Sequence, residues 1–126
     1  MNSGPILVVD DDWEVRDLLR STLEFFGYSV VPTSNGAEAM QRAHQVTPFA
    51  ITLDLLLPDV NGFEVARQLK ADPRTQPVWI VAVTVLSSSQ ARERALAAGV
   101  DEFLVKPFEL RDLVAAIQRN RNWLER

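Results

Sequence analysis

Four polar side chains suited to phosphoryl or metal chemistry come directly after short, mostly apolar runs: Asp10, Asp54, Thr84 and Lys106. A carboxylate can act as a nucleophile or hold a metal ion, and a hydroxyl can bond a phosphoryl oxygen. A lysine can offset the charge of a transferring phosphoryl group. Taken singly, each residue has an ordinary reading as a helix cap, a turn or a solvated strand end. Brought together in one pocket, the four predict a site for a phosphoryl group.

The acidic residues also predict a cation at that site. Asp10, Asp11 and Asp54 would repel one another in a shared pocket. Lys106 together with one divalent ion would balance their three negative charges. Carboxylate oxygens are hard donors, and the chain has no Cys and one His, so the predicted ion is Mg²⁺ rather than Zn²⁺. We expect Asp12 to cap the helix that follows.

Length and composition narrow the class of protein. A chain of 126 residues favours one domain, and 47% hydrophobic with 24% charged residues argues against disorder. The net charge of −4 argues against a nucleic-acid-binding face. The most apolar run, residues 78–86, is too short to span a bilayer, and the N-terminus does not resemble a signal peptide. We expect a soluble, cytoplasmic domain without direct contact to nucleic acid or membrane.

Apolar runs alternate with helical periodicity along the chain. Strands are predicted over 6–9, 28–31, 49–53, 78–83 and 101–105, and helices over 15–26, 36–45, 62–71, 89–98 and 110–117. The first helix is predicted to bury one face made of Val15, Leu18, Leu19, Thr22, Leu23 and Phe26. Such alternation is typical of a parallel sheet with helices on both faces. Ligands bind such sheets beyond the carboxyl ends of the strands, where the four polar residues lie.

Four segments together resemble the receiver domain of two-component response regulators. They are Ile6 to Asp12, Leu53 to Gly62, Val83-Thr84, and Phe103 to Phe108. The resemblance covers about residues 5–124, and we expect residues 1–126 to form a single receiver domain. It implies an α/β, flavodoxin-like, doubly wound (βα)5 fold whose five parallel strands have the order 2-1-3-4-5.

The resemblance also implies roles for the pocket residues. Asp54 corresponds to the phospho-acceptor, and Lys106 would pair with Asp54 and then with the phosphoryl oxygens. Asp10 and Asp11 correspond to the acidic pair that holds Mg²⁺ together with Asp54. The backbone carbonyl of Leu56 corresponds to a further metal ligand.

A second set of positions resembles the family's switch. The hydroxyl of Thr84 would move to the phosphoryl group, and the ring of Phe103 would move inward behind it. The bond between Lys106 and Pro107 corresponds to a cis peptide. The expected output surface is the fourth helix, fifth strand and fifth helix near Phe103, where Ala91, Ala95 and Ala98 are predicted to leave a shallow surface.

Three apolar residues are expected to tune access to the acceptor. Val85 stands where the family usually has a small residue, and its extra methyl groups could narrow the opening. Leu56 and Leu86 correspond to the two variable positions beside the approach of water, and neither can orient a water molecule. We therefore expect slow dephosphorylation. His44 is interpreted as a surface residue rather than a phosphorelay histidine.

The resemblance predicts a signalling module that catalyses its own phosphorylation and dephosphorylation but turns over no other substrate. Its expected partners are a histidine kinase or phosphotransfer protein and a downstream protein or output domain, with a phosphorylation-dependent homodimer as a further expectation. The main alternative is a haloacid dehalogenase-type phosphatase with Asp10 as nucleophile, which leaves Asp54 without a role. A receiver-like docking module that acts without phosphate is the second alternative. Trp123 and Leu124 are expected either to pack on the fold or to begin a linker.

Overall fold

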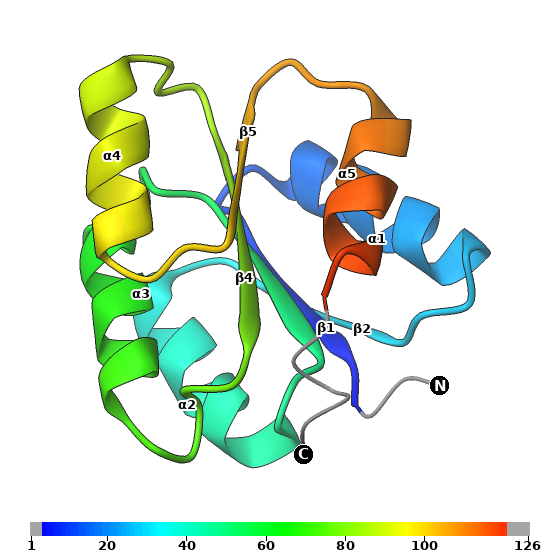
Figure 1. The fold of residues 1–126 in the computed structure, drawn as a ribbon. Coiled ribbons are helices and arrows are strands. Elements are labelled where there is room, and N and C mark those ends of the chain that lie inside the picture. The colour runs from blue at the N-terminus through cyan, green and yellow to red at the C-terminus, as the bar shows by residue number, and fades with distance from the viewer. Residues whose placement is uncertain (1–3, 121–126) are drawn as a thin grey trace.

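The strands and helices alternate without exception in the computed structural model, which describes residues 4–120. Their bounds are β1 (Ile6–Val9), α1 (Trp13–Phe25), β2 (Val30–Thr33), α2 (Gly36–Val46), β3 (Ala50–Leu53), α3 (Gly62–Ala71), β4 (Trp79–Thr84), α4 (Ser89–Ala97), β5 (Glu102–Val105) and α5 (Leu110–Gln118). The five strands are parallel and lie in the order β2-β1-β3-β4-β5. Helices α1 and α5 cover one face of the sheet, and α2, α3 and α4 cover the other (Figure 1). The predicted fold is confirmed.

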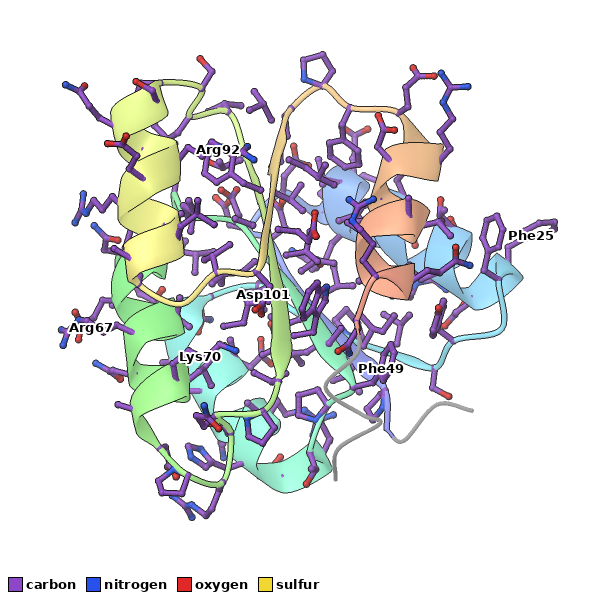
Figure 2. All side chains as sticks on the ribbon, in the orientation of Figure 1. Phe25, Phe49, Arg67, Lys70, Arg92 and Asp101 are labelled. Atoms are coloured by element: carbon purple, nitrogen blue, oxygen red, sulfur yellow. The ribbon has the colours of Figure 1, made fainter. Side chains whose placement is uncertain are left out.

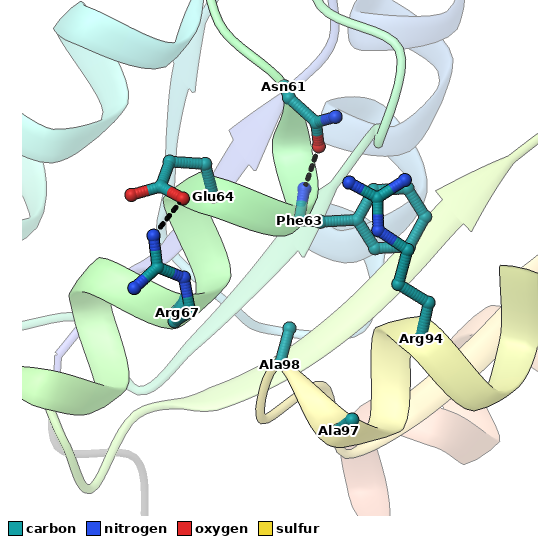
Figure 3. Close-up of a pocket in the computed structure, with 7 residues that line it drawn as sticks. All are labelled: Asn61, Phe63, Glu64, Arg67, Arg94, Ala97 and Ala98. Atoms are coloured by element: carbon teal, nitrogen blue, oxygen red, sulfur yellow. Dashed lines mark hydrogen bonds and ion pairs between the residues drawn. The ribbon is translucent and has the colours of Figure 1, made fainter.

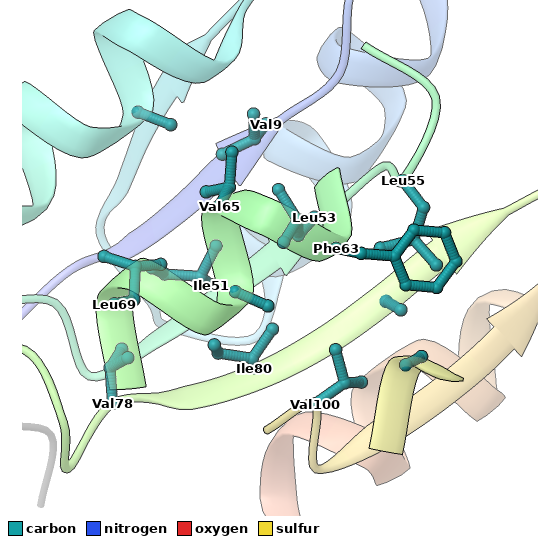
Figure 4. Packing of buried hydrophobic residues seen from close by; sticks show 14 of the residues in the cluster. Val9, Ile51, Leu53, Leu55, Phe63, Val65, Leu69, Val78, Ile80 and Val100 are labelled. Carbon is teal, nitrogen blue, oxygen red and sulfur yellow. The ribbon is translucent and has the colours of Figure 1, made fainter. Parts of the chain in front are cut away.

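Two apolar layers hold the sheet between the helices. All four residues of β1 and all four of β3 are buried, as expected for central strands covered on both faces. Figure 4 shows the larger layer, in which Ile51 and Leu53 of β3 lie beside Val65 and Leu69 of α3. The smaller layer joins alternate strand residues to α1 and α5. The site at the strand ends therefore stands on a rigid, close-packed support.

The second strand begins later than predicted. It runs over Val30–Thr33 instead of 28–31 and includes Pro32. The amide of Tyr28 donates to the Leu23 carbonyl and so belongs to the end of α1, next to Gly27 with its φ of 94°. Because β2 is an edge strand, Pro32 can lie in it without removing a hydrogen bond from the interior of the sheet.

The apolar face of α1 is narrower than predicted. Leu19 and Leu23 are buried, but Leu18 is 48% exposed and Phe26 is 52% exposed. Phe25 is 84% exposed and extends away from the body of the molecule in Figure 2. The helix rests on one side of the sheet, so only the positions aimed at the sheet are covered, and the outer part of the predicted face remains in water.

The alanines of α4 do not form the shallow output surface that was predicted. Ala95 is fully buried, and Ala91 and Ala98 pack against the larger apolar layer. Their small side chains let α4 approach the sheet, so they form its inner face. The prediction was wrong because it assigned the small residues to the wrong side of the helix.

Among residues 4–120, no helix has the length and apolar character needed to cross a bilayer. The predictions for Trp123 and Leu124 and for the last residues of the core lie outside the described residues.

Candidate functional site

The parallel register brings the acidic residues together. Val9 and Leu53 are register partners at the ends of β1 and β3, and the amide of Asp54 donates to the Val9 carbonyl at 3.0 Å. Asp10 and Asp54 follow these strands directly and are buried, whereas Asp11 is exposed. Carboxylate oxygens of Asp10, Asp11 and Asp54 lie within 4.8 Å of one another. The predicted acidic cluster therefore exists as a compact group.

Lys106 completes the pocket from β5. Its Nζ donates to Asp10 Oδ2 at 2.8 Å and to Asp54 Oδ2 at 3.2 Å. Its backbone amide donates to the Thr84 carbonyl at 2.7 Å, which aligns the ends of β4 and β5. The peptide bond between Lys106 and Pro107 is cis. The structure thus places Lys106 beside Asp54, as the sequence predicted, and also beside Asp10, which it did not predict.

Burial and charge shape the electrostatics of this group. Burial raises the pKa of Asp10, although the hydrogen bonds from Lys106 and from the Asp12 amide oppose that rise. Burial alone would lower the pKa of Lys106, but its hydrogen bond to Asp10 and the charges of Asp10 and Asp54 raise it. Lys106 is therefore held as a cation in a pocket where acidic groups outnumber it.

The donor set suits a hard divalent cation. Asp54 Oδ1 accepts from the Leu56 amide at 3.0 Å, so the backbone that follows Asp54 folds closely around this carboxylate. Three carboxylates in one pocket with a single lysine leave negative charge that a divalent ion can neutralise. The residues present therefore fit Mg²⁺, which prefers carboxylate, carbonyl and water oxygens.

Thr84 and Phe103 both face inward. Thr84 is fully buried, and its hydroxyl oxygen accepts from the Leu86 amide at 3.3 Å. The ring of Phe103 is 8% exposed and belongs to the larger apolar layer, with the Arg92 guanidinium 5.7 Å from its centroid. In this conformation the Phe103 ring already has the inward position that was predicted to follow phosphorylation, because it is buried.

The three apolar residues near the opening differ in their surroundings. Leu56 is 48% exposed and Val85 is 59% exposed, so both border solvent. Leu86 is partly buried and packs against the larger apolar layer. Asp12 caps α1, since its side chain accepts from the Glu14 amide at 2.9 Å, as predicted.

Several contacts were not foreseen from the sequence. Arg16 donates to the backbone carbonyl of Asp10 at 2.8 Å and so holds the end of β1. Arg16 lies in the first turn of α1, from which a long side chain can reach back to the end of β1. An arginine at this spacing after the strand was therefore the signal in the sequence. His44 is half-buried rather than on the open surface, with Nε2 2.8 Å from Asp72 Oδ2 and Nδ1 2.9 Å from the Met40 carbonyl.

A hollow between α3 and α4 lies apart from the acidic pocket (Figure 3). It has a volume of about 310 Å³, and the Arg94 guanidinium lies over the Phe63 ring at 4.1 Å from its centroid. Asn61 caps α3 through the Phe63 amide at 2.7 Å, and Arg67 pairs with Glu64. These contacts are made within the lining itself, so the hollow is a packing feature of the two helices.

Comparison with known proteins shows the family. The model of the response regulator receiver domain matches residues 6–118. "Response regulator MprA" of Mycobacterium leprae is 42% identical over 90% of this chain and 49% of that protein. The "DNA-binding dual master transcriptional regulator RpaA" of Synechocystis is 35% identical over 90% of this chain and 47% of that protein. The chain thus spans about half the length of the curated relatives it matches.

Solved structures agree with this match. Chemotaxis protein CheY4 of Vibrio cholerae has a TM-score of 0.87 at 28% identity, covering 93% of this chain and 98% of that one. The receiver domain of sensor histidine kinase PA1611 of Pseudomonas aeruginosa has a TM-score of 0.85 at 30% identity, covering 94% and 97%, and is described with a magnesium ion in its active site cleft. The haloacid dehalogenase alternative is therefore set aside. The chain belongs to the response regulator receiver domain family.

Proposed function

We propose that Asp54 accepts a phosphoryl group from a histidine kinase or phosphotransfer protein, and that the resulting change at α4, β5 and α5 controls a downstream protein or output domain. One observation carries this proposal: Lys106 Nζ bridges Asp54 and Asp10 inside the acidic cluster. A cation held against a buried carboxylate can stabilise the charge of a phosphoryl group that is transferred to that carboxylate.

The chemistry follows from these groups. A carboxylate oxygen of Asp54 attacks phosphorus, the bond from phosphorus to the donor atom breaks, and an aspartyl phosphate forms. Lys106 can donate to an oxygen of the new phosphoryl group because its Nζ already lies beside Asp54 and Asp10. The hydroxyl of Thr84, whose oxygen accepts from the Leu86 amide, can donate its hydrogen to a phosphoryl oxygen.

We propose Mg²⁺ as the cation, held by the carboxylates of Asp10, Asp11 and Asp54 and by the Leu56 carbonyl. When bound, it supplies positive charge at the phosphoryl oxygens. The hard donor set and the magnesium described in the Pseudomonas aeruginosa receiver domain support this choice.

The wider setting is also proposed. We propose a cytoplasmic domain that catalyses only its own phosphorylation and dephosphorylation and forms a homodimer when phosphorylated. RpaA is named a DNA-binding regulator, but the net charge of this chain, −4, favours a domain that acts on a partner rather than on DNA itself. Electrophoretic mobility of DNA with the unphosphorylated and phosphorylated chain would test this last point.

The acceptor is tested by incubating the chain with acetyl phosphate and MgCl₂ and measuring its intact mass and elution volume. The wild-type chain should gain one phosphoryl group, and Asp54→Asn should gain none. Asp17→Asn, which removes an exposed carboxylate of α1, should label normally. Undiminished labelling of Asp54→Asn would refute the assignment, and a folded wild type that takes up no phosphate would favour the phosphate-independent docking module.

A further inference from the structure

The loop between β3 and α3 carries the acceptor and the carbonyl assigned to the metal. It closes on itself, because Leu56 and Asn61 form a β-bridge and the Gly62 amide donates to the Leu55 carbonyl at 3.0 Å. A Cβ on Gly62 would lie 2.5 Å from Leu55 Cα, so the close approach requires glycine. These contacts shape the loop but do not attach it to the rest of the fold.

Leu55, Leu57 and Val60 pack the loop on the larger apolar layer, and Asp59, near its end, bonds it to α2. Its Oδ1 accepts from the Gly36 amide at 2.9 Å and its Oδ2 accepts from the Ala37 amide at 3.0 Å. Gly36 and Ala37 begin α2, and the first amides of a helix have no partner within it. These two backbone bonds lower the pKa of Asp59, which keeps the carboxylate charged.

An apolar contact reinforces the same attachment. A Cβ added to Gly36 would lie 2.1 Å from Val60 Cγ1, so the loop packs directly on the first residue of α2. The helix has a cap of its own as well, because Asn35 Oδ1 accepts from the Glu38 amide at 2.8 Å. Asp59 therefore does more than supply the ordinary cap, since it joins a distant loop to the helix.

We propose that Asp59 is a positioning residue, which fixes the β3–α3 loop on α2 and so holds the Leu56 carbonyl beside Asp10 and Asp11. This inference rests on the proposed magnesium site. Groups that orient metal ligands without touching the metal commonly change metal affinity by tenfold or more. Asp59 would act in this way although it is exposed and its carboxylate is bonded to the start of α2.

The test compares two variants that each remove a side-chain cap from the same helix. Asp59→Ala removes the link between loop and helix, whereas Asn35→Ala removes only the local cap. By calorimetric titration of Mg²⁺, Asp59→Ala should bind about tenfold more weakly than wild type, and Asn35→Ala should bind as wild type does. Asp59→Asn, which keeps one acceptor oxygen, should fall between. Gly36→Ala should also weaken binding, because its methyl group must push Val60 and the loop away.

Hydrogen exchange without metal gives a second, independent readout. Asp59→Ala should speed exchange at Gly36 and Ala37 and also at Leu56 and Gly62 in the loop. Asn35→Ala should speed exchange at Glu38 alone. Wild-type Mg²⁺ affinity and loop protection in Asp59→Ala, or equal losses in Asp59→Ala and Asn35→Ala, would overturn the proposal. A wild-type chain that binds no Mg²⁺ would refute the metal assignment, and loop exchange would then decide the role of Asp59.

Discussion

Lys106 Nζ lies closer to the carboxylate of Asp10 than to that of Asp54, at 2.8 Å against 3.2 Å. The lysine is thus shared between a proposed metal ligand and the proposed acceptor. One cation restrains both buried carboxylates before any phosphoryl group arrives. Its side chain does not need to cross the pocket to reach a phosphoryl oxygen on Asp54.

The first prediction concerns this shared lysine. Lys106→Met keeps most of the side-chain volume but removes the charge, so the phosphoryl oxygens lose a positioned cation. We expect the rate of labelling by acetyl phosphate to fall about a hundredfold, as for loss of one positioned donor. Intact-mass kinetics would measure it. Lys70→Met, which removes a lysine bonded to the Val78 carbonyl at 2.7 Å far from the pocket, is the control; equal rates in the two variants would contradict the role of Lys106.

The second prediction concerns the switch. Thr84→Ala should still accept phosphate, because Asp54 and Lys106 remain, but it should lose much of the change in the surroundings of Phe103. A ligand shifts two states only through its different affinity for them, and the Thr84 hydroxyl supplies that difference. Fluorine NMR of fluorophenylalanine-labelled chain would follow the ring. Thr33→Ala removes another buried threonine at a strand end and should leave the response intact. A full response in Thr84→Ala would refute the mechanism.

The residues of the pocket could be predicted because of where strands end. Asp10 and Asp54 each follow a buried strand directly, Lys106 follows β5 directly, and parallel strands bring their carboxyl ends to one edge. A position directly after a strand was therefore enough to predict that these side chains meet at one edge of the sheet. The strand order could not be deduced from the alternation of elements and came only from the family resemblance.

Contacts that depend on packing between loops and helices could not be predicted in this way. The sequence around Asp59 indicates only a turn, whereas its bonds to Gly36 and Ala37 join residues more than 20 positions apart in the chain. The additional bond of Lys106 to Asp10 likewise depends on side-chain geometry. The exposure of Leu18 depends on how α1 rests on the sheet, which its apolar spacing does not determine.

The third prediction uses a buried hydroxyl without a partner. Among the described residues, Thr52 Oγ1 is the buried side-chain oxygen with no hydrogen bond. Thr52→Val replaces that hydroxyl with a methyl group of similar size and should raise the free energy of unfolding by about 1 kcal/mol. Urea denaturation would measure it. Thr75→Val should have the opposite effect, because Thr75 donates to the Leu69 carbonyl at 2.6 Å; a loss of stability in both variants would show that Thr52 is satisfied in solution.

The fourth prediction concerns pH. The hydrogen bonds from the Arg74 side chain and amide, and then that from His44, lower the pKa of Asp72. A carboxyl group with a lowered folded pKa stabilises the fold above its unfolded pKa of about 3.9 and loses that effect as the pH falls toward the folded value. Asp72→Asn should therefore be less stable than wild type at pH 7, and the difference should shrink below pH 4. Urea midpoints between pH 7 and pH 3 would show it, and a difference that stays constant would contradict it.

The last prediction concerns the lifetime of the phosphoryl group. Water must approach the phosphorus opposite the aspartyl oxygen, and the resemblance places Leu56 and Leu86 beside that path. Leu56 is the better site for a test because it is 48% exposed, whereas Leu86 packs against the apolar layer, where a charged replacement would cost stability. The amide of Leu56→Asn could orient a water molecule. A tenfold faster decay needs an activation free energy only about 1.4 kcal/mol lower.

The measurement is the decay of intact phosphorylated mass under saturating Mg²⁺, after removal of acetyl phosphate. Val85→Ala is the matched control, since it widens the opening at an exposed position without adding a group that can bind water. Faster decay in Leu56→Asn but not in Val85→Ala would show that oriented water limits the rate in wild type. Faster decay in Val85→Ala alone would show that access limits it. Equal rates in all three chains would mean that neither side chain controls the approach of water, and the prediction of slow dephosphorylation from these residues would be wrong.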